Sequence, residues 1–181
     1  EITDKEYWEK RYTMNIGSGP GSKGHLAAMK AFFIDYQLTL YGMTSVAEIG
    51  CGDGAQQFKI QSPVSYIGTD ISDIAIEKCQ ILWNGNEKRK FMKWSDFNQS
   101  DYKFDIVMSL DIIIHITSLD DFLFHMDLLD RKSKRFICIY SSDFSHSSKE
   151  EFDYMRSWDV SSAMKLLKPE YRLIAYQRNP Y

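Results

Sequence analysis

Residues 45–54 read Ser-Val-Ala-Glu-Ile-Gly-Cys-Gly-Asp-Gly, a short apolar run followed at once by three glycines in five residues. The run predicts a buried strand over Ser45–Ile49, and the glycines predict a tight turn before a helix that begins near Ala55. Strand, turn and helix in that order place the turn at the carboxyl edge of a parallel sheet, where open α/β sheets bind ligands. Gly50 permits the turn and Gly52 lets the backbone approach a ligand, since neither carries a Cβ.

The rest of the chain alternates short apolar runs with amphipathic stretches, which predicts one α/β domain over residues 1–181 with a mostly parallel sheet and helices on both faces. Further strands are expected over Val64–Thr69, Phe91–Trp94, Phe104–Leu110, Arg135–Tyr140 and Tyr171–Gln177. Helices are expected over residues 4–12 and 25–41, after the caps Ser72 and Ser118, and near residues 149–166. Because residue 1 is Glu rather than Met, the sequence also fits a domain excised from a longer protein.

The helix expected over residues 25–41 has apolar residues at helical spacing, which predicts that this side faces the core. These residues are Leu26, Met29, Phe33, Tyr36 and Leu40.

The composition disfavours several classes of protein, although it does not exclude a nucleic-acid partner. Hydrophobic residues make up 44% of 181, enough for a packed core, and the net charge of −3 lacks the basic excess typical of nucleic-acid binding. No apolar run is long enough to span a bilayer, and the polar N-terminus does not resemble a signal peptide. The three cysteines, Cys51, Cys79 and Cys138, form no CxxC pair and indicate reduced thiols. We therefore expect a cytoplasmic protein with no membrane span, for which a nucleic-acid partner is disfavoured.

A glycine turn of this kind can bind a dinucleotide or a cationic ligand, and the charges of the neighbouring side chains distinguish the two. Gly50, Gly52 and Ala55 also fit the dinucleotide fingerprint, but a pyrophosphate over the turn would be repelled by Glu48 and Asp53. Those acids suit a cationic ligand such as S-adenosylmethionine (SAM), which carries an ammonium and a sulfonium and no phosphate. The alternative is that both acids only accept hydrogen bonds from backbone amides.

Two further acids follow successive strands. Asp70 ends the second strand at a spacing from Glu48 that suits a carboxylate binding ribose hydroxyls. Asp96 follows the third strand, where it could accept from the adenine amino group while Phe97 packs beside the ring. Three acids at successive strand ends favour an adenosine-containing ligand.

At these residues the chain resembles the class I SAM-dependent methyltransferases. Val46–Gly54 looks like their first motif, Gly68–Ser72 like the second, Ser95–Phe97 like the third and Phe104–Asp111 like the fourth. The resemblance covers most of the chain and implies a Rossmann-like fold with a seven-stranded sheet or a truncated form of it. It also implies SAM as the methyl donor and S-adenosylhomocysteine (SAH) as the product.

The N-terminal Tyr7-Trp8…Arg11-Tyr12 is similar to the YW..RY opening of several small-molecule methyltransferases. In those enzymes this helix covers the cofactor and the arginine meets its carboxylate, a role that the resemblance assigns to Arg11. The cofactor-binding residues predicted in all are Arg11, Glu48, Gly50, Cys51, Gly52, Asp53, Asp70, Ile71, Asp96, Phe97, Ser109 and Leu110.

The end of the fourth strand predicts the reacting groups, Asp111 and His115. A neutral hydroxyl is a poor nucleophile and needs a base, and the ordinary pKa of histidine suits that task. We predict these two residues as the catalytic pair, with either one as the base. The alternative is that His115 packs beneath an apolar turn and bonds to the backbone.

No metal is expected, although Asp111 with Asp143 leaves a metal-dependent mechanism as an alternative. His125 falls on the polar side of its expected helix, which predicts a solvated residue.

Hydroxyls, one acid and aromatic side chains follow the fifth strand, and such a mixture is typical of carbohydrate sites. The predicted substrate-binding residues are Tyr140, Asp143, His146, Arg156 and Trp158. The alternative is an ordinary surface loop with core aromatics.

A narrower resemblance supports a sugar acceptor. Gly17–Lys30, Glu48–Gln57 and Ser109–His115 look like stretches of methyltransferases in surface-glycan synthesis, some of which are attached to glycosyltransferases, including viral multidomain enzymes. The resemblance implies a SAM-dependent O-methyltransferase that acts on a sugar hydroxyl of a glycan. The alternatives are a methyltransferase acting on a small metabolite or RNA, and a SAM-binding module without catalysis.

Overall fold

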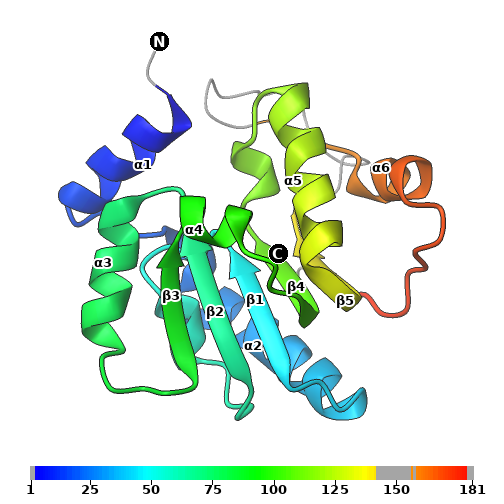
Figure 1. Ribbon diagram of the computed structural model, residues 1–181, viewed down its shortest axis with the longest axis horizontal. Coiled ribbons are helices and arrows are strands. Elements are labelled where there is room, and N and C mark those ends of the chain that lie inside the picture. Colours follow the sequence, from blue (N-terminus) through cyan, green and yellow to red (C-terminus); the bar gives the residue numbers. More distant parts are fainter. Residues whose placement is uncertain (1–2, 142–155, 157, 179–181) are drawn as a thin grey trace.

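The computed structural model describes residues 3–141, 156 and 158–178. They form a five-stranded parallel sheet in the order β3-β2-β1-β4-β5 (Figure 1). The strands are β1 (Ser45–Ile49), β2 (Ser65–Asp70), β3 (Arg89–Lys93), β4 (Phe104–Leu110) and β5 (Ser133–Tyr140). The predicted α/β fold is confirmed.

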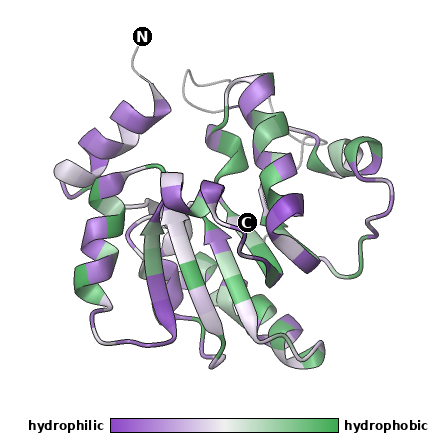
Figure 2. Cartoon of the chain, in the orientation of Figure 1, coloured by the Kyte–Doolittle hydropathy of each residue, from purple (hydrophilic) through white to green (hydrophobic). Residues whose placement is uncertain are grey.

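Helices cover both faces of the sheet. They are α1 (Asp4–Thr13), α2 (Gly24–Leu40), α3 (Asp73–Leu82), α4 (Trp94–Gln99), α5 (Leu119–Lys132) and α6 (Val160–Leu167). In β1 successive side chains point to opposite faces, so Val46 joins a core with Ile76 of α3, whereas Ala47 joins a second core with Met126 of α5. Helix α2 lies behind the sheet in Figure 1 and α5 in front of it, and hydrophobic and hydrophilic residues alternate along α5 as one buried side requires (Figure 2).

The core-facing side of α2 differs from the predicted one. Tyr36 and Leu40 are exposed, and the helix turns another row toward the sheet. The buried residues of α2 are Ala27, Lys30, Ala31, Ile34 and Leu38. The predicted side is therefore wrong: the row that packs on the sheet combines two alanines with Ile34 and Leu38, and it includes a lysine that the apolar pattern did not count.

The strand register brings the carboxyl ends of the central strands together. Ile49 of β1 lies beside Thr69 of β2 on one side and beside Ser109 of β4 on the other, and Leu110 lies beside Tyr140 of β5. The chain runs outward from β1 through β2 to β3 and then returns to the other side of β1 with β4. This reversal is the switch point at which doubly wound sheets bind ligands.

Three expected elements differ from the structure. Tyr171–Gln177 forms no strand, and Leu173 and Ile174 within it are exposed, so the described part of the chain has five strands rather than seven. The helix expected from Ala55 is only a short 3-10 helix, Ala55–Phe58, and Trp94 begins α4 instead of ending β3. The helix expected near 149–166 is described only from Val160, because residues 142–155 and 157 lie outside the described residues.

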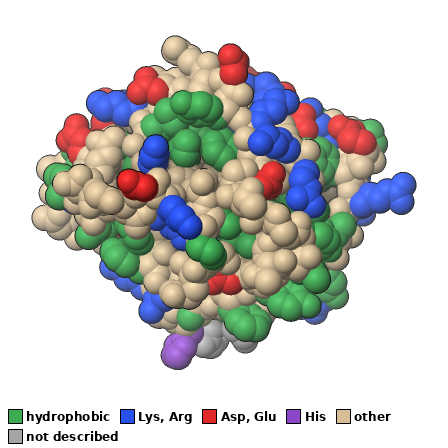
Figure 3. Space-filling model, turned by 60° about the horizontal axis from the view of Figure 1, so that its bottom comes forward, with side chains coloured by type: hydrophobic (Ala, Val, Ile, Leu, Met, Phe, Trp, Pro, Cys, Tyr) green, Lys and Arg blue, Asp and Glu red, His purple; other side chains and the backbone are tan. Residues whose placement is uncertain are grey.

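None of the helices that the structure describes is long and apolar enough to cross a bilayer. The view from below the sheet of Figure 1 shows acidic and basic side chains scattered among hydrophobic ones (Figure 3).

Candidate functional site

A cavity of about 860 Å³ lies at the carboxyl ends of β1, β2 and β4. Its walls come from α1, the segment between α1 and α2, the start of α2, the β4–α5 connection and α5. Figure 1 shows α1 and the upper end of α5, which both contribute lining residues, on either side of the strand tips. The cavity therefore occupies the switch point.

The glycine turn after β1 forms the floor of this cavity. Gly50 and Gly52 have left-handed backbone conformations, with φ of 77° and 57°. A Cβ on Gly50 would overlap Ile112, and one on Gly52 would overlap the Ser18 hydroxyl and lie 2.7 Å from the hydroxyl of Tyr12. The positive φ of Gly50 fits the tight turn predicted there, and the close approach of a ligand at Gly52 stays a prediction, because the close neighbours here are side chains of the cavity wall.

Asp70 ends β2 beside this turn. Its carboxylate accepts hydrogen bonds from the backbone N–H of Gly52 and of Ser72, each at 2.9 Å. Burial raises the pKa of Asp70 to about 6, although the two amide bonds oppose that shift. Asp70 lines the cavity together with the neighbouring Ile71, as predicted for a ribose site.

Glu48 lies deeper, 2% exposed, at the end of β1. Its Oε2 accepts from the Tyr66 hydroxyl at 2.7 Å and from Gln57 Nε2 at 2.5 Å. Burial raises the pKa of Glu48, and the two donors act in the opposite direction. Glu48 still lines the cavity, so it combines an internal hydrogen-bond role with a place at the site.

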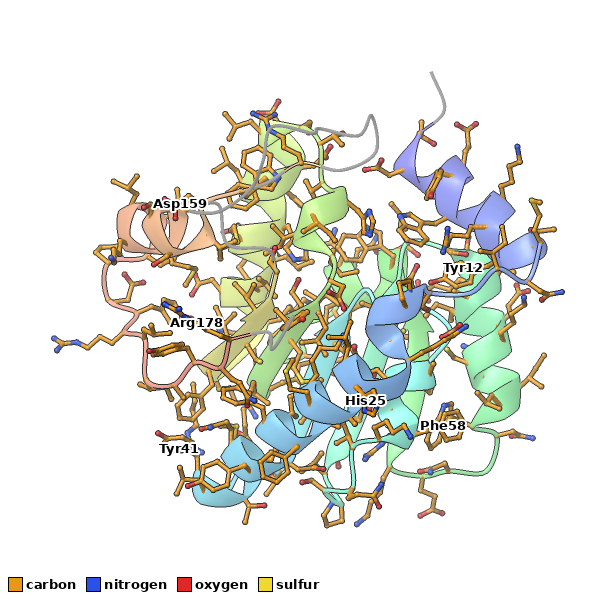
Figure 4. The ribbon with its side chains drawn as sticks, turned by 180° about the vertical axis from the view of Figure 1, so that it is seen from behind. Tyr12, His25, Tyr41, Phe58, Asp159 and Arg178 are labelled. Atoms are coloured by element: carbon orange, nitrogen blue, oxygen red, sulfur yellow. The ribbon has the colours of Figure 1, made fainter. Side chains whose placement is uncertain are left out.

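Helix α1 closes the cavity from one side and is fastened to α3. The Glu9 carboxylate accepts from the backbone N–H of Asp73 at 2.9 Å and from the Ser72 hydroxyl at 3.0 Å, both at the start of α3. Tyr12, which Figure 4 labels, lies near the end of α1, and its hydroxyl is 3.1 Å from the hydroxyl of Ser18. Arg11 lines the cavity, and its Nε donates to the carbonyl of Gly17.

Asp111 and His115 follow β4, and both line the cavity. Asp111 has a left-handed backbone, φ 61°, and its carboxylate pairs with the buried Lys30 at 2.5 Å. His115 lies in a 3-10 turn, and its ring meets that of Trp8 edge-on with centroids 5.0 Å apart. The alternative prediction is that His115 packs beneath an apolar turn. Its ring instead packs against Trp8 of α1, and His115 still lines the cavity.

Four predicted cofactor residues do not line the cavity. Asp96 is exposed, and Phe97 is fully buried and stacks on Phe104, so the prediction of Phe97 beside an adenine ring is wrong in this structure. Asp53 instead accepts from the backbone N–H of Ser18 and of Ala55, which matches the backbone-capping alternative.

Ser109, the fourth, is buried beneath the cavity and pairs with His125. Its hydroxyl lies 2.9 Å from His125 Nε2. His125 is 5% exposed, and burial lowers its pKa to about 4. The prediction of a solvated His125 is therefore wrong, and this histidine lines the cavity.

The predicted acceptor residues separate into three groups. Tyr140 lines the cavity at the end of β5. Arg156 and Trp158 do not: Arg156 donates to the carbonyl of Thr117, and Trp158 stacks on Phe122 with centroids 4.3 Å apart. Asp143 and His146 lie outside the described residues. Lys30 lines the cavity although the sequence indicated no role for it there, whereas Trp8 and Tyr12 belong to the helix that the resemblance placed over the cofactor.

Comparison with known proteins identifies related folds. Residues 40–178 match a family described as a methyltransferase domain. No curated protein is significantly similar in sequence.

Among solved structures, magnesium protoporphyrin IX methyltransferase from Synechocystis PCC 6803 with bound SAM is 19% identical, with a TM-score of 0.58 over 83% of this chain and 82% of that one. An amino pentose methyltransferase from Micromonospora echinaspora, also with SAM, is 11% identical, with a TM-score of 0.58 over 82% and 61%. The N-terminal domain of EvdMO1 in the presence of SAH and D-fucose is 16% identical, with a TM-score of 0.53 over 84% and 71%.

Proposed function

Because the chain belongs to the methyltransferase family, we propose that it transfers the methyl group of SAM to a hydroxyl of a sugar in a glycan. The family membership makes it a SAM-dependent methyltransferase; the acceptor and the residue roles are our proposal. The observation that carries the proposal is one cavity lined both by the glycine turn with Asp70, which we assign to the donor end, and by Asp111 and His115, which we assign to the acceptor end.

The donor end fits SAM in shape and in charge. The missing Cβ atoms of Gly50 and Gly52 allow a ligand to lie close over the turn. Asp70 offers carboxylate oxygens to ribose hydroxyls, and Glu48 adds negative charge near a ligand ammonium. Arg11 offers a guanidinium for the carboxylate of the methionine moiety.

The acceptor end supplies the groups that an alcohol needs. SAM, when bound, provides a methyl carbon on a sulfonium that leaves readily as a neutral thioether. His115 takes the proton of the attacking hydroxyl, and Asp111 accepts a hydrogen bond from the acceptor and holds it in line. Trp8 and Tyr140 are flat apolar surfaces on which a sugar ring can rest.

Two of the three similar structures support a sugar as the methyl acceptor, and the third supports a different kind of acceptor. One is an amino pentose methyltransferase and the other is the EvdMO1 domain in the presence of D-fucose, so both are associated with sugars. The porphyrin methyltransferase favours a flat apolar acceptor, and Ile114, Ile116 and Phe124 on the cavity wall would suit one. A small apolar metabolite is therefore the second candidate.

The test is SAH production from SAM with a panel of methyl glycosides and a parallel panel of phenols and aromatic carboxylic acids. We expect turnover with glycosides that His115→Asn abolishes while SAH still binds. Turnover with the aromatic panel alone would refute the sugar acceptor and favour the second candidate.

A further inference from the structure

Lys30 is a buried lysine that the proposed function has not yet used. It lies on α2, is 4% exposed and lines the cavity. Its Nζ donates to Asp111 Oδ2 at 2.5 Å and stands 4.9 Å from the centroid of the Tyr140 ring. Because an ammonium so deeply buried is costly without a counter-charge, the two residues depend on each other.

Three elements fix the position of the Asp111 carboxylate. Helix α2 reaches it through Lys30. Strand β5 holds its backbone, since the N–H of Asp111 donates to the carbonyl of Tyr140 at 2.9 Å. Gly21 lies so close that a Cβ there would come within 2.5 Å of Asp111 Oδ2. A carboxylate held in this way suits a fixed hydrogen-bond acceptor in the cavity wall.

We propose that Lys30 is a positioning residue for methyl transfer: it holds Asp111 as the acceptor of a hydrogen bond from a sugar hydroxyl next to the reacting one, and leaves His115 as the base for the reacting hydroxyl. The inference rests on the proposed function. In the step, the hydroxyl oxygen bonds to the methyl carbon, the carbon–sulfur bond breaks with its electron pair left on sulfur, and the hydroxyl proton passes to His115.

The charges around the two candidate bases support this division. A proton on Asp111 would remove the counter-charge of the buried Lys30. A proton on His115 is favoured by an electrostatic interaction with Asp4 of α1, which lines the same cavity. The proton is therefore more favourably placed on the histidine.

A second buried lysine provides a matched control. Lys132 of α5 is 2% exposed and stands 5.0 Å from the Phe97 ring. Its ammonium donates to the carbonyl and the hydroxyl of Ser100, and it does not line the cavity. The two lysines share burial and an aromatic neighbour but differ in the carboxylate partner.

The experiment compares Lys30→Met, Lys30→Arg and Lys132→Met by SAH calorimetry, thermal unfolding, and kcat and KM for the best glycoside of the panel. We expect Lys30→Met to lower kcat about 100-fold, as a misplaced reacting group does, with SAH affinity within about threefold of the wild type. Lys30→Arg should recover at least part of kcat. Lys132→Met should lower the melting temperature and leave kcat of the folded enzyme within about twofold.

A Lys30→Met enzyme with wild-type kcat, or one that loses SAH affinity together with turnover, would overturn the role of Lys30. If Lys30→Met does not fold, Lys30→Met combined with Asp111→Asn removes both charges, and its kcat should fall as far as that of Asp111→Asn alone, because the pair acts as a unit. A further loss in the double variant would contradict the proposal. A wild-type enzyme that binds SAH but turns over no glycoside would overturn the proposed acceptor, and the inference with it.

Discussion

The two ends of the cavity are built differently. The donor end consists of strand tips and the turn that follows β1, so Gly50, Gly52 and Asp70 come from adjacent strands in fixed register. The acceptor end combines Asp111 and His115 after β4 with Lys30 of α2 and other side chains from α1 and β5. The comparison teaches that one end depends on local backbone geometry and the other on how helices pack.

Their electrostatics differ as well. At the donor end, no lysine or arginine of the described residues forms an ion pair with Glu48 or Asp70, and burial raises the pKa of both carboxyl groups. At the acceptor end, Asp111 has Lys30 as its counter-ion. Lys30 also interacts electrostatically with Glu48 and opposes the rise in the pKa of that carboxyl group. Among the described residues, the two ends therefore differ in that Asp111 has an ion-pair partner and Asp70 has none.

The largest effect is expected at the acceptor end. His115→Asn should lower kcat by about 100- to 1000-fold, because the proton of the acceptor hydroxyl loses its base. SAH affinity, measured by calorimetry, should stay within about threefold. His25→Asn, an exposed change on α2 outside the cavity, is the control and should leave both quantities unchanged. If His115→Asn instead abolished SAH binding and spared kcat, the two ends would not be separable as described.

The next effect tests the donor end. Gly52→Ala should weaken SAH binding about 100-fold, because the new Cβ overlaps Ser18 and forces the turn away from the ligand. Gly42→Ala is the matched control, since Gly42 has nearly the same φ, 59°, and nothing within 4 Å of a Cβ. Both variants bear the strain of a left-handed alanine, about 1–2 kcal/mol, so only the difference between them reports on the site. Equal SAH affinities would contradict the close approach.

Asp70 should make SAH binding depend on pH. Its raised pKa of about 6 means that the carboxyl becomes protonated as the pH falls through that value, and the ionised form that accepts ribose hydroxyls is lost. We expect SAH affinity to be constant above about pH 7 and to fall about tenfold by pH 5. Asp70→Asn should bind about tenfold more weakly at pH 8 and show a flat profile between pH 5 and 8. A wild-type profile as flat as that of the variant would remove Asp70 from the ligand contacts.

The raised pKa of Asp70 affects the stability of the fold in the opposite direction: SAH affinity falls as the pH falls, whereas stability falls as the pH rises. The folded state holds the proton of Asp70 more tightly than the unfolded chain, so this group's contribution to the free energy of unfolding decreases as the pH rises from about 4 to 6. Denaturant titrations of wild type and Asp70→Asn should therefore differ in slope over this interval. Parallel curves would contradict a buried Asp70 carboxyl.

The smallest effect is expected at Asp96, which the sequence assigned to the adenine and the structure leaves exposed outside the cavity. Asp96→Asn should change SAH affinity less than about twofold. A loss of tenfold or more would show that the carboxylate turns into the site when ligand binds, and would restore the prediction made from the sequence.

The two ends of the cavity also differ in how much of their structure could be predicted from the sequence. The glycine turn, Asp70 and the strands beside them were predictable, because strand, turn and acid spacing are local properties of the sequence. Lys30 was not, since the sequence of α2 offers a second apolar row, and only packing decides that Ala27 and Ala31 face the sheet with the lysine between them. Tyr171–Gln177 has the composition of a strand but pairs with none in the described part of the chain.

His125 illustrates the same limit. Its position among the polar residues of α5 predicted exposure, yet the helix is buried deeply enough to bring it against Ser109. A single hydroxyl partner on a neighbouring strand satisfies the imidazole, and no pattern along the helix reports that partner.

The most direct test is a crystal structure of the protein with SAH. We predict that the ribose hydroxyls lie against Asp70, that the ligand crosses Gly50 and Gly52, and that its sulfur faces Asp111 and His115. A ligand whose ribose lies away from Asp70, or whose sulfur faces away from Asp111 and His115, would contradict the account of both ends of the cavity.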